Sequence, residues 1–105
     1  MKEELFKEIT TWQNNTFVHA TAASKLAHLQ QEMQELLAEI KHENYSTRST
    51  ERKLEFADCF ILLFGAAASD GMSYEDIQAC LQQKMAINYK RNWGKPNEDG
   101  VVNHV

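Results

Sequence analysis

Apolar residues recur at intervals of three and four along most of this chain, and this helical period is the feature that most constrains its fold. The first periodic segment carries Leu5, Ile9 and Trp12 on one face. The second has a longer apolar stripe, expected to be its core face, of Leu26, Leu29, Met33, Leu36 and Ile40. Only four glycines and one proline occur in 105 residues, and most chain-breaking residues fall between the periodic segments. The pattern predicts an all-α fold with about four helices in a bundle.

Chain-breaking and capping residues place the ends of the four predicted helices. The helices are expected at residues 2–13, from Thr21 or Ser24 to 44, 50–69 and 73–92. Asn14 and Asn15 are expected to end the first, and either Thr21 or Ser24 suits an N-cap of the second. Ser73 followed by Asp76 resembles a capping box for the fourth, which Gly94 and Pro96 are expected to follow. A chain of this length is expected to form one domain, residues 1–105.

Charge and cysteine content narrow the setting. The formal net charge of −4 argues against a nucleic-acid polymer as the main partner, because such binders usually have a dominant basic surface. No apolar run approaches the length of a membrane span, and the N-terminal residues are amphipathic rather than typical of a signal peptide. Cys59 and Cys80 form no CxxC motif and are predicted to be buried thiols. We therefore expect a cytoplasmic protein.

The stretch EFADCFILLF, residues 55–64, places a carboxylate, Asp58, in an otherwise apolar segment. Its apolar side chains point in different directions at about 100° per residue, so this helix is expected to be buried centrally. An unpaired aspartate in such a segment is hard to explain as a surface residue. Glu55 lies three residues earlier and is therefore its neighbour on the helix.

The second predicted helix carries a matching pair, Glu32 and Glu35, on a flank of its apolar stripe, and His28 and Glu39 extend the line. If the two helices pack antiparallel, the two pairs face each other in one partly buried place. Such a cluster needs a cation, because repulsion and desolvation otherwise favour protonation. Arg52 and Lys53 lie off the acidic line, whereas Mg²⁺ prefers carboxylate oxygens. Taken alone, Glu32 and Glu35 are also explained as solvated surface acids.

A cationic stripe follows in the fourth predicted helix. Lys84, Asn88 and Arg91 recur at spacings of four and three, in a segment that has no acidic residue. A polyphosphate suits this face, with its charges on the two cations. The same spacing also fits a solvated face whose cations complement the C-terminal end of the helix dipole. Trp93 would either stack on a base or seal the helix.

These segments together resemble a known family. HLQQEMQELLAEI, residues 28–40, and EFADCFILL, residues 55–63, look like the ExxE…ExxD signature of the all-α NTP pyrophosphatases, the MazG-like superfamily. The tail KMAINYKRNWGKPNEDGVVNHV resembles that of a phage and bacterial branch of dATP/dGTP diphosphohydrolases. The resemblance runs from about Trp12 to Val105, and the K-x₃-N-x₂-R and WGKPN segments make it more specific than the acidic signature alone.

The resemblance implies Mg²⁺-dependent hydrolysis of a nucleoside triphosphate, dATP or dGTP, to the monophosphate and pyrophosphate, with Mn²⁺ as a substitute cation. Carried over by position, the metal-binding and catalytic residues are Glu32, Glu35, Glu55 and Asp58. The phosphate contacts would be Lys84, Asn88 and Arg91, and we assign Trp93, Lys95 and His28 to the substrate site as well. The resemblance also implies a homodimer or homotetramer whose pocket a neighbouring chain completes.

One position departs from the family pattern. Many members have two adjacent glutamates at the start of the first motif, and here the first is Gln31. A neutral amide adds no charge and is a poor general base, so Glu35 or Glu32 is the expected proton acceptor for the attacking water. Phe17, Trp12 and His28 are candidates to line a base pocket, although core packing explains the two aromatic residues equally well.

Three other functions fit parts of the pattern. A di-iron carboxylate bundle needs two Glu-x-x-His motifs, and Glu39 with His42 supplies one while Asp58 occupies the place of the second. A non-catalytic helical adaptor would pair Asp58 with a cation of the protein and would be indifferent to Mg²⁺. A metal-binding or nucleotide-sensing protein lies between these and the enzyme, and Gln31 leaves it open.

Overall fold

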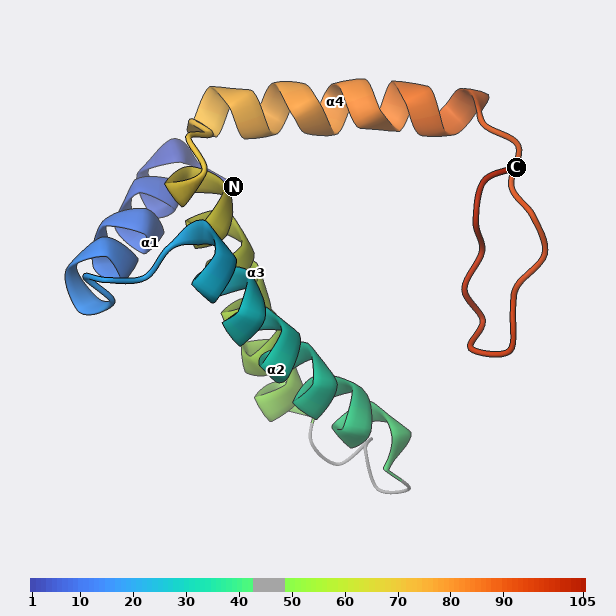
Figure 1. Ribbon diagram of the computed structural model, residues 1–105, viewed down its shortest axis with the longest axis horizontal. Helices are drawn as coiled ribbons and strands as arrows, with labels where there is room; N and C mark the ends of the chain where they lie inside the picture. The colour runs from blue at the N-terminus through green and yellow to red at the C-terminus, as the bar shows by residue number, and fades with distance from the viewer. Residues whose placement is uncertain (43–48) are drawn as a thin grey trace. The chain divides into compact units, whose positions relative to one another are not determined.

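The computed structural model describes residues 1–42 and 49–105. Its regular elements are four helices: α1 (Glu3–Thr16), α2 (Ala22–Lys41), α3 (Ser49–Ser69) and α4 (Tyr74–Lys90) (Figure 1). In these residues the one extended pairing is an isolated antiparallel bridge between Trp93 and His104. The all-α prediction with four helices is confirmed.

The described chain divides into two compact parts, Met1–Ser73 and Tyr74–Val105. The first contains α1, α2 and α3, and the second contains α4 and the C-terminal segment. The single domain expected over residues 1–105 stays a prediction. Among the described residues no single helix is long and apolar enough to cross a membrane. α3 and α4 meet the length and composition that a span needs only when taken together, with a break between them.

Several predicted helix ends differ from the observed ones. Asn14 and Asn15 remain helical and α1 continues to Thr16, so the predicted end there is wrong. The helix ends where Phe17 leaves helical geometry, with its N–H still bonded to the Gln13 carbonyl at 2.8 Å. Its last turn thus keeps a backbone bond, which the asparagines do not disrupt. α4 ends at Lys90, short of the expected residue 92.

The capping prediction for α2 is confirmed. The Thr21 hydroxyl accepts a hydrogen bond from the Ser24 N–H at 3.1 Å, and the Ser24 hydroxyl accepts one from the Thr21 N–H at 2.9 Å. This reciprocal pair is a capping box. α4 begins directly after Ser73, as expected, while the contact of Ser73 with Asp76 stays a prediction. The predicted C-terminal end of the second helix, residue 44, and residues 45–48 of the following loop lie outside the described residues.

The core of the first part forms where α1 and α2 pack on α3 (Figure 1). Its buried apolar residues are Phe6, Leu29, Leu36, Leu62 and Ala66. Burying each of the large ones contributes about 1.5–3 kcal/mol. The Lys25 ammonium near the start of α2 donates to the Ser69 hydroxyl at the end of α3, at 2.7 Å, so the two helices run antiparallel, as expected.

α1 is joined to α3 by a buried polar side chain. Gln13 is fully buried, and its amide Nε2 donates to the Ile61 carbonyl at 2.7 Å. The amide lies where a Cβ on Gly65 would be, so only glycine permits this approach. An edge-to-face contact between Phe6 and Phe64, with ring centroids 6.1 Å apart, adds a second junction between α1 and α3.

The buried face of α2 is rotated from the predicted one. Leu29 and Leu36 are buried as expected, whereas Leu26, Met33 and Ile40 are exposed. Lys25, only 3% exposed, joins the buried face instead. The helix carries apolar residues on more than one side, and α3 covers only one of them. Because Glu32 follows Lys25 by seven residues, it lies on the side that packs toward α3.

α3 is not buried on all sides, contrary to the prediction. Phe56, Phe60 and Leu63 are 43%, 56% and 47% exposed, and Asp58 is exposed as well. Within the first part α1 and α2 cover two sides of the helix and leave the remaining side uncovered. The apolar sequence of α3 therefore led to a wrong prediction of full burial, because α1 and α2 cover only part of its surface.

In the second part, the C-terminal segment folds back on itself after α4 (Figure 1). The Gly94 N–H donates to the Asn103 carbonyl and the Val105 N–H to the Asn92 carbonyl, both at 2.8 Å. The Asn97 side chain supports the turn by accepting from the N–H groups of Asp99 and Val101, each at 2.9 Å. Gly100 has φ 81°, which favours glycine there.

Candidate active site

Two of the predicted acids, Glu32 and Asp58, line one cavity of about 190 Å³ in the first part of the structure. Glu32 projects from α2 and Asp58 from α3, and the antiparallel packing of these helices brings them to the same level. Ile61 and Leu62, one turn beyond Asp58, supply the apolar part of the lining. The sequence assigned both to the core, although their spacing from Asp58 is the signal that places them beside it.

Three rings form another wall of this cavity: Trp12 of α1, Phe17 at the end of α1 and His28 of α2. Phe17 contacts Trp12 edge to face, with centroids 5.6 Å apart and planes at 85°. It contacts His28 in the same manner at 6.4 Å and 88°. The irregular segment between α1 and α2 thus serves to place Phe17 between two other rings. All three candidates for the base pocket lie together.

His28 also contacts one of the acids. Its Nε2 lies 3.4 Å from Oε1 of Glu32, one helical turn further along α2. Both side chains are partly exposed, so solvent weakens the contact between them. His28 thus contacts both Phe17 of the ring wall and the Glu32 carboxylate.

The thiol of Cys59, the residue after Asp58, has a pKa that is raised by its surroundings. Burial raises the pKa of its thiol above 9.0, and the negative charges of Glu32, Asp58 and Glu55 raise it further. Three of the four predicted acids therefore act electrostatically on one half-buried thiol, and α2 and α3 both contribute. Cys59 is half-buried and Cys80 is exposed on α4, so the prediction that both thiols are buried is wrong for Cys80 and only partly met by Cys59.

The acids differ in exposure. Glu32 and Glu55 are half-buried, while Asp58 and Glu35 are exposed. Glu35, three residues beyond Glu32 on α2, is not part of the cavity lining. In the described residues, no three carboxylate, imidazole or thiol groups are placed to hold one ion together.

The chemistry of the donor set nevertheless fits a hard divalent cation. Glu32 and Asp58 present carboxylate oxygens to the same cavity. Mg²⁺ is commonly held by one or two carboxylates and completes its shell with water and substrate phosphates. The residues present therefore suit a cation that binds together with a phosphorylated ligand.

The predicted phosphate contacts lie in the second part of the structure. Lys84 is exposed on α4, Asn88 is half-buried near its end, and Arg91 is the first residue after it. The Trp93 indole N–H donates to the Asn88 carbonyl at 3.3 Å, and its ring meets His104 edge to face. Trp93 thus seals the end of α4, one of the two roles expected for it. Lys95 is exposed in the segment that follows.

A family model for dATP/dGTP pyrophosphohydrolases matches residues 5–105. The chain belongs to this family. A dATP/dGTP diphosphohydrolase of Salmonella phage PMBT28 is 35% identical over 99 residues, which cover 94% of this chain and 30% of the phage protein. The chain thus spans about a third of the length of that curated relative.

A solved structure is similar to this dATP/dGTP pyrophosphohydrolase family member over nearly its full length. It is a MazG-like pyrophosphohydrolase of cyanophage S-2L, bound to dGDP and three catalytic Mn²⁺ ions per active site. The TM-score is 0.74 at 27% identity, and the match covers 97% of this chain and 94% of the cyanophage chain. The MazG-like fold and the family predicted from the acidic signature and the tail are confirmed.

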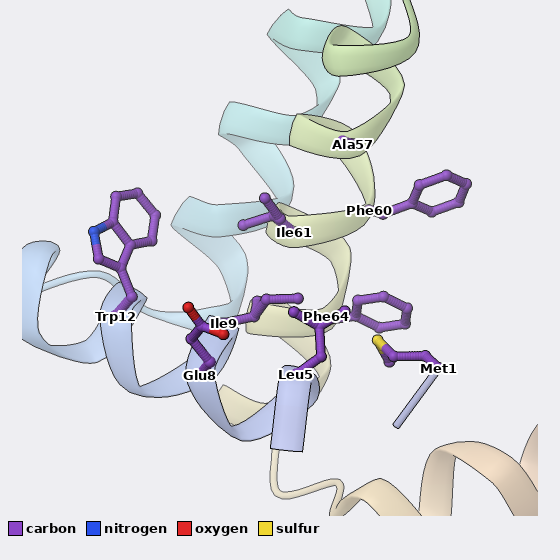
Figure 2. A pocket seen from close by; sticks show the side chains of 9 residues that line it. All are labelled: Met1, Leu5, Glu8, Ile9, Trp12, Ala57, Phe60, Ile61 and Phe64. Carbon is purple, nitrogen blue, oxygen red and sulfur yellow. The ribbon is translucent and has the colours of Figure 1, made fainter. Parts of the chain in front are cut away.

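An apolar groove of about 670 Å³ adjoins the cavity in this family member. Trp12 and Ile61 line both (Figure 2). The groove runs between α1 and α3, and its other large apolar residues are Met1, Leu5, Ile9, Phe60 and Phe64. Leu5, Ile9 and Trp12, the stripe that the sequence placed on one face of α1, thus line an open groove, while Phe6 and Gln13 of the same helix are buried.

Proposed function

We propose that this protein hydrolyses a purine deoxynucleoside triphosphate, dATP or dGTP, to the monophosphate and pyrophosphate, with Mg²⁺ or Mn²⁺ as cofactor. The observation that carries the proposal is the cavity where Glu32 and Asp58 meet the ring wall of Trp12, Phe17 and His28. Acidic oxygens suit the cation of a metal–triphosphate, and the rings suit a base. Family membership and the dGDP and Mn²⁺ of the cyanophage protein support it.

Glu32 and Asp58, which line the same cavity, would hold the cation, and the family signature implies Glu55 and Glu35 as further ligands. When bound, divalent ions supply charge neutralisation for the phosphates and lower the pKa of a bound water. Glu32, Glu55 and Asp58 all lie near enough to the Cys59 thiol to act on it electrostatically, so a divalent cation there would be attracted by more than one negative charge.

Hydrolysis replaces one bond at the α-phosphorus. Water attacks this atom, the bond to the oxygen that bridges the α- and β-phosphorus breaks, and pyrophosphate leaves with that oxygen. Glu35 or Glu32 takes the proton that the water loses. Gln31 is exposed on α2 and, being neutral, takes no proton.

Lys84, Asn88 and Arg91 are proposed to contact the phosphates, and Lys95 to add a further cation nearby. Arg91 follows directly on the last helical residue of α4, where the folded-back tail begins. The helix therefore constrains Lys84 and Asn88, and the Arg91 N–H, which donates to the Asn88 carbonyl at 3.3 Å, ties Arg91 to the end of the helix. Cations held in place bind a polyanion at a lower entropic cost than freely moving ones.

The base is proposed to pack against Trp12 and Phe17. The cavity, about 190 Å³, is smaller than the roughly 300–1,000 Å³ typical of pockets for drug-sized ligands, so it takes one part of a nucleotide rather than all of it. A flat purine ring presents more surface to these rings than a pyrimidine does. This favours dATP or dGTP over dCTP and dTTP.

The active form is proposed to be a homodimer or homotetramer. Leu26, Met33 and Ile40 recur every seven residues on α2 and are 47%, 48% and 37% exposed, which is typical of a helix that packs on another helix. The apolar groove between α1 and α3 is a second surface for another copy of this chain. Because the groove shares Trp12 and Ile61 with the cavity, a neighbouring chain there would complete the site. Sedimentation velocity measures the assembly directly.

A substrate panel tests the proposed reaction. The protein is incubated with each dNTP and NTP in the presence of Mg²⁺ or Mn²⁺, and the products are separated by ion exchange. Monophosphate and pyrophosphate from dATP or dGTP are expected, and EDTA should prevent their formation. Binding of these nucleotides without product would instead favour a nucleotide-sensing protein, the rival function that the neutral Gln31 leaves open.

A further inference from the structure

We propose that His28 is a positioning residue that fixes the Glu32 carboxylate for the cation and ties it to the ring wall. This inference rests on the proposed function, because it concerns how that site is organised. His28 would thereby connect the part of the site that holds the base with the part that holds the cation.

The first observation is the contact between the two side chains. His28 Nε2 lies 3.4 Å from Glu32 Oε1, and the two residues are one turn apart on α2. Both line the cavity that also contains Asp58. A proton on Nε2 donates toward Oε1, which leaves Oε2 of Glu32 for a cation. The contact is longer than an ideal N–H···O hydrogen bond of about 2.9 Å and lies within the roughly 4 Å reach of an ion pair.

The second observation is the position of the same ring in the aromatic wall. His28 meets Phe17 edge to face, and Phe17 meets Trp12 in the same way. A base that packs on Phe17 or Trp12 therefore restricts the His28 ring through the contact between Phe17 and His28. The orientation of that ring sets the direction of its N–H and hence the rotamer of Glu32.

The physical basis is the freedom of a glutamate side chain. Glu32 has three rotatable bonds and is partly exposed, so a cation must order it on binding. A residue that orders a ligand in advance lowers this cost, and removing such a partner typically weakens metal affinity about 10–100-fold. His28 is the imidazole within reach of Glu32 among the described residues.

Two substitutions separate the two contacts of His28. His28→Phe keeps a ring against Phe17 and removes the N–H, whereas His28→Gln keeps an N–H donor and removes the ring. His19→Phe is the matched control, because His19 is exposed in the segment after α1 and does not line the cavity. Mn²⁺ affinity is measured from the rise in melting temperature with Mn²⁺ concentration, without nucleotide. KM and kcat for dATP and dGTP are measured at saturating Mn²⁺.

We expect His28→Phe to weaken Mn²⁺ binding about 10–100-fold, a larger effect than its effect on KM. His28→Gln should bind Mn²⁺ nearly as the natural protein does and raise KM. His19→Phe should change neither. Mn²⁺ binding by His28→Phe that equals that of the natural protein overturns the proposal, as does an equal loss of both properties in the two variants together with a lower melting temperature.

Failure of the proposed function gives a different result. If the natural protein releases no pyrophosphate from any triphosphate but His28→Phe still loses Mn²⁺ affinity, the reaction is wrong and the positioning role stands. If the natural protein is active and His28→Phe binds Mn²⁺ normally, the reaction stands and the positioning role is wrong.

Discussion

The Gln13 amide of α1 occupies the space beside Gly65 of α3 that a side chain there would fill. Glycine within a helix usually costs about 0.5–1 kcal/mol relative to alanine. Here it allows a fully buried amide to reach the Ile61 carbonyl. Trp12 and Phe17 lie just before and just after Gln13 in the sequence. The contact of Gln13 with α3 therefore also fixes the position of these two rings beside α3.

Gly65→Ala is expected to destabilise the protein although it improves helix propensity. The added methyl group overlaps the buried amide, and overpacking of this kind costs about 1–3 kcal/mol. The free energy of unfolding in urea measures the change. Gln13→Ala removes the obstacle, so the double variant should lose less stability than the sum of the single changes. Additive losses would show that the two residues do not share this space.

Asp58→Asn is expected to lower kcat for dATP or dGTP more than about 100-fold, because removing a direct ligand costs at least as much as removing its supporting partner. The helical circular dichroism should stay unchanged, since Asp58 is exposed. Glu4→Gln is the control, an exposed acid of α1 outside the cavity. Activity retained by Asp58→Asn, measured as pyrophosphate release, would remove this residue from the site.

Arg91→Ala and Lys84→Ala are expected to raise KM for the triphosphate on the order of 10-fold each, because each removes a charge-assisted hydrogen bond to phosphate. Lys90→Ala is the matched control, since Lys90 is an exposed cation next to Arg91 that does not belong to the Lys84, Asn88 and Arg91 series. A control that raises KM as much as the two variants would point to overall charge instead of specific contacts.

The thiol of Cys59 is expected to react with iodoacetamide more slowly than that of Cys80 at pH 8. Its pKa is raised by burial and by the three neighbouring carboxylates, and the thiolate is the reactive form. Glu32→Gln removes one of these charges, lowers the pKa and should speed the reaction, as followed by peptide mass spectrometry. An unchanged rate in Glu32→Gln would place Glu32 too far from the thiol to act on it.

The same shift has a defined effect on stability. Because the folded pKa of Cys59 lies above its ordinary value of 9.0, the unfolded chain loses this proton first as pH rises. The stability that the protonated thiol contributes is therefore complete below pH 9 and is lost as the pH rises through the folded pKa. A Cys59→Ser variant should show a weaker loss of stability above pH 9 in urea unfolding experiments.

Local signals alone determined the helices of this protein, the capping box of Thr21 and Ser24, and the residue types of the acidic signature. Such features depend on neighbours within about four residues along the chain, and these neighbours can be read from the sequence. The family followed from the same kind of signal, because each of its motifs is a short stretch of sequence.

Tertiary packing alone decided which side of α2 faces α3. The helix has apolar residues on several sides, and the choice depends on the partner surface, which local periodicity does not contain. That choice buries Lys25, exposes Leu26 and Met33, and turns Glu32 toward the cavity that Asp58 also lines. The meeting of acids from α2 and α3 beside the rings of Trp12 and Phe17 is a property of the assembled helices, since residues far apart in the chain come together only when the helices pack.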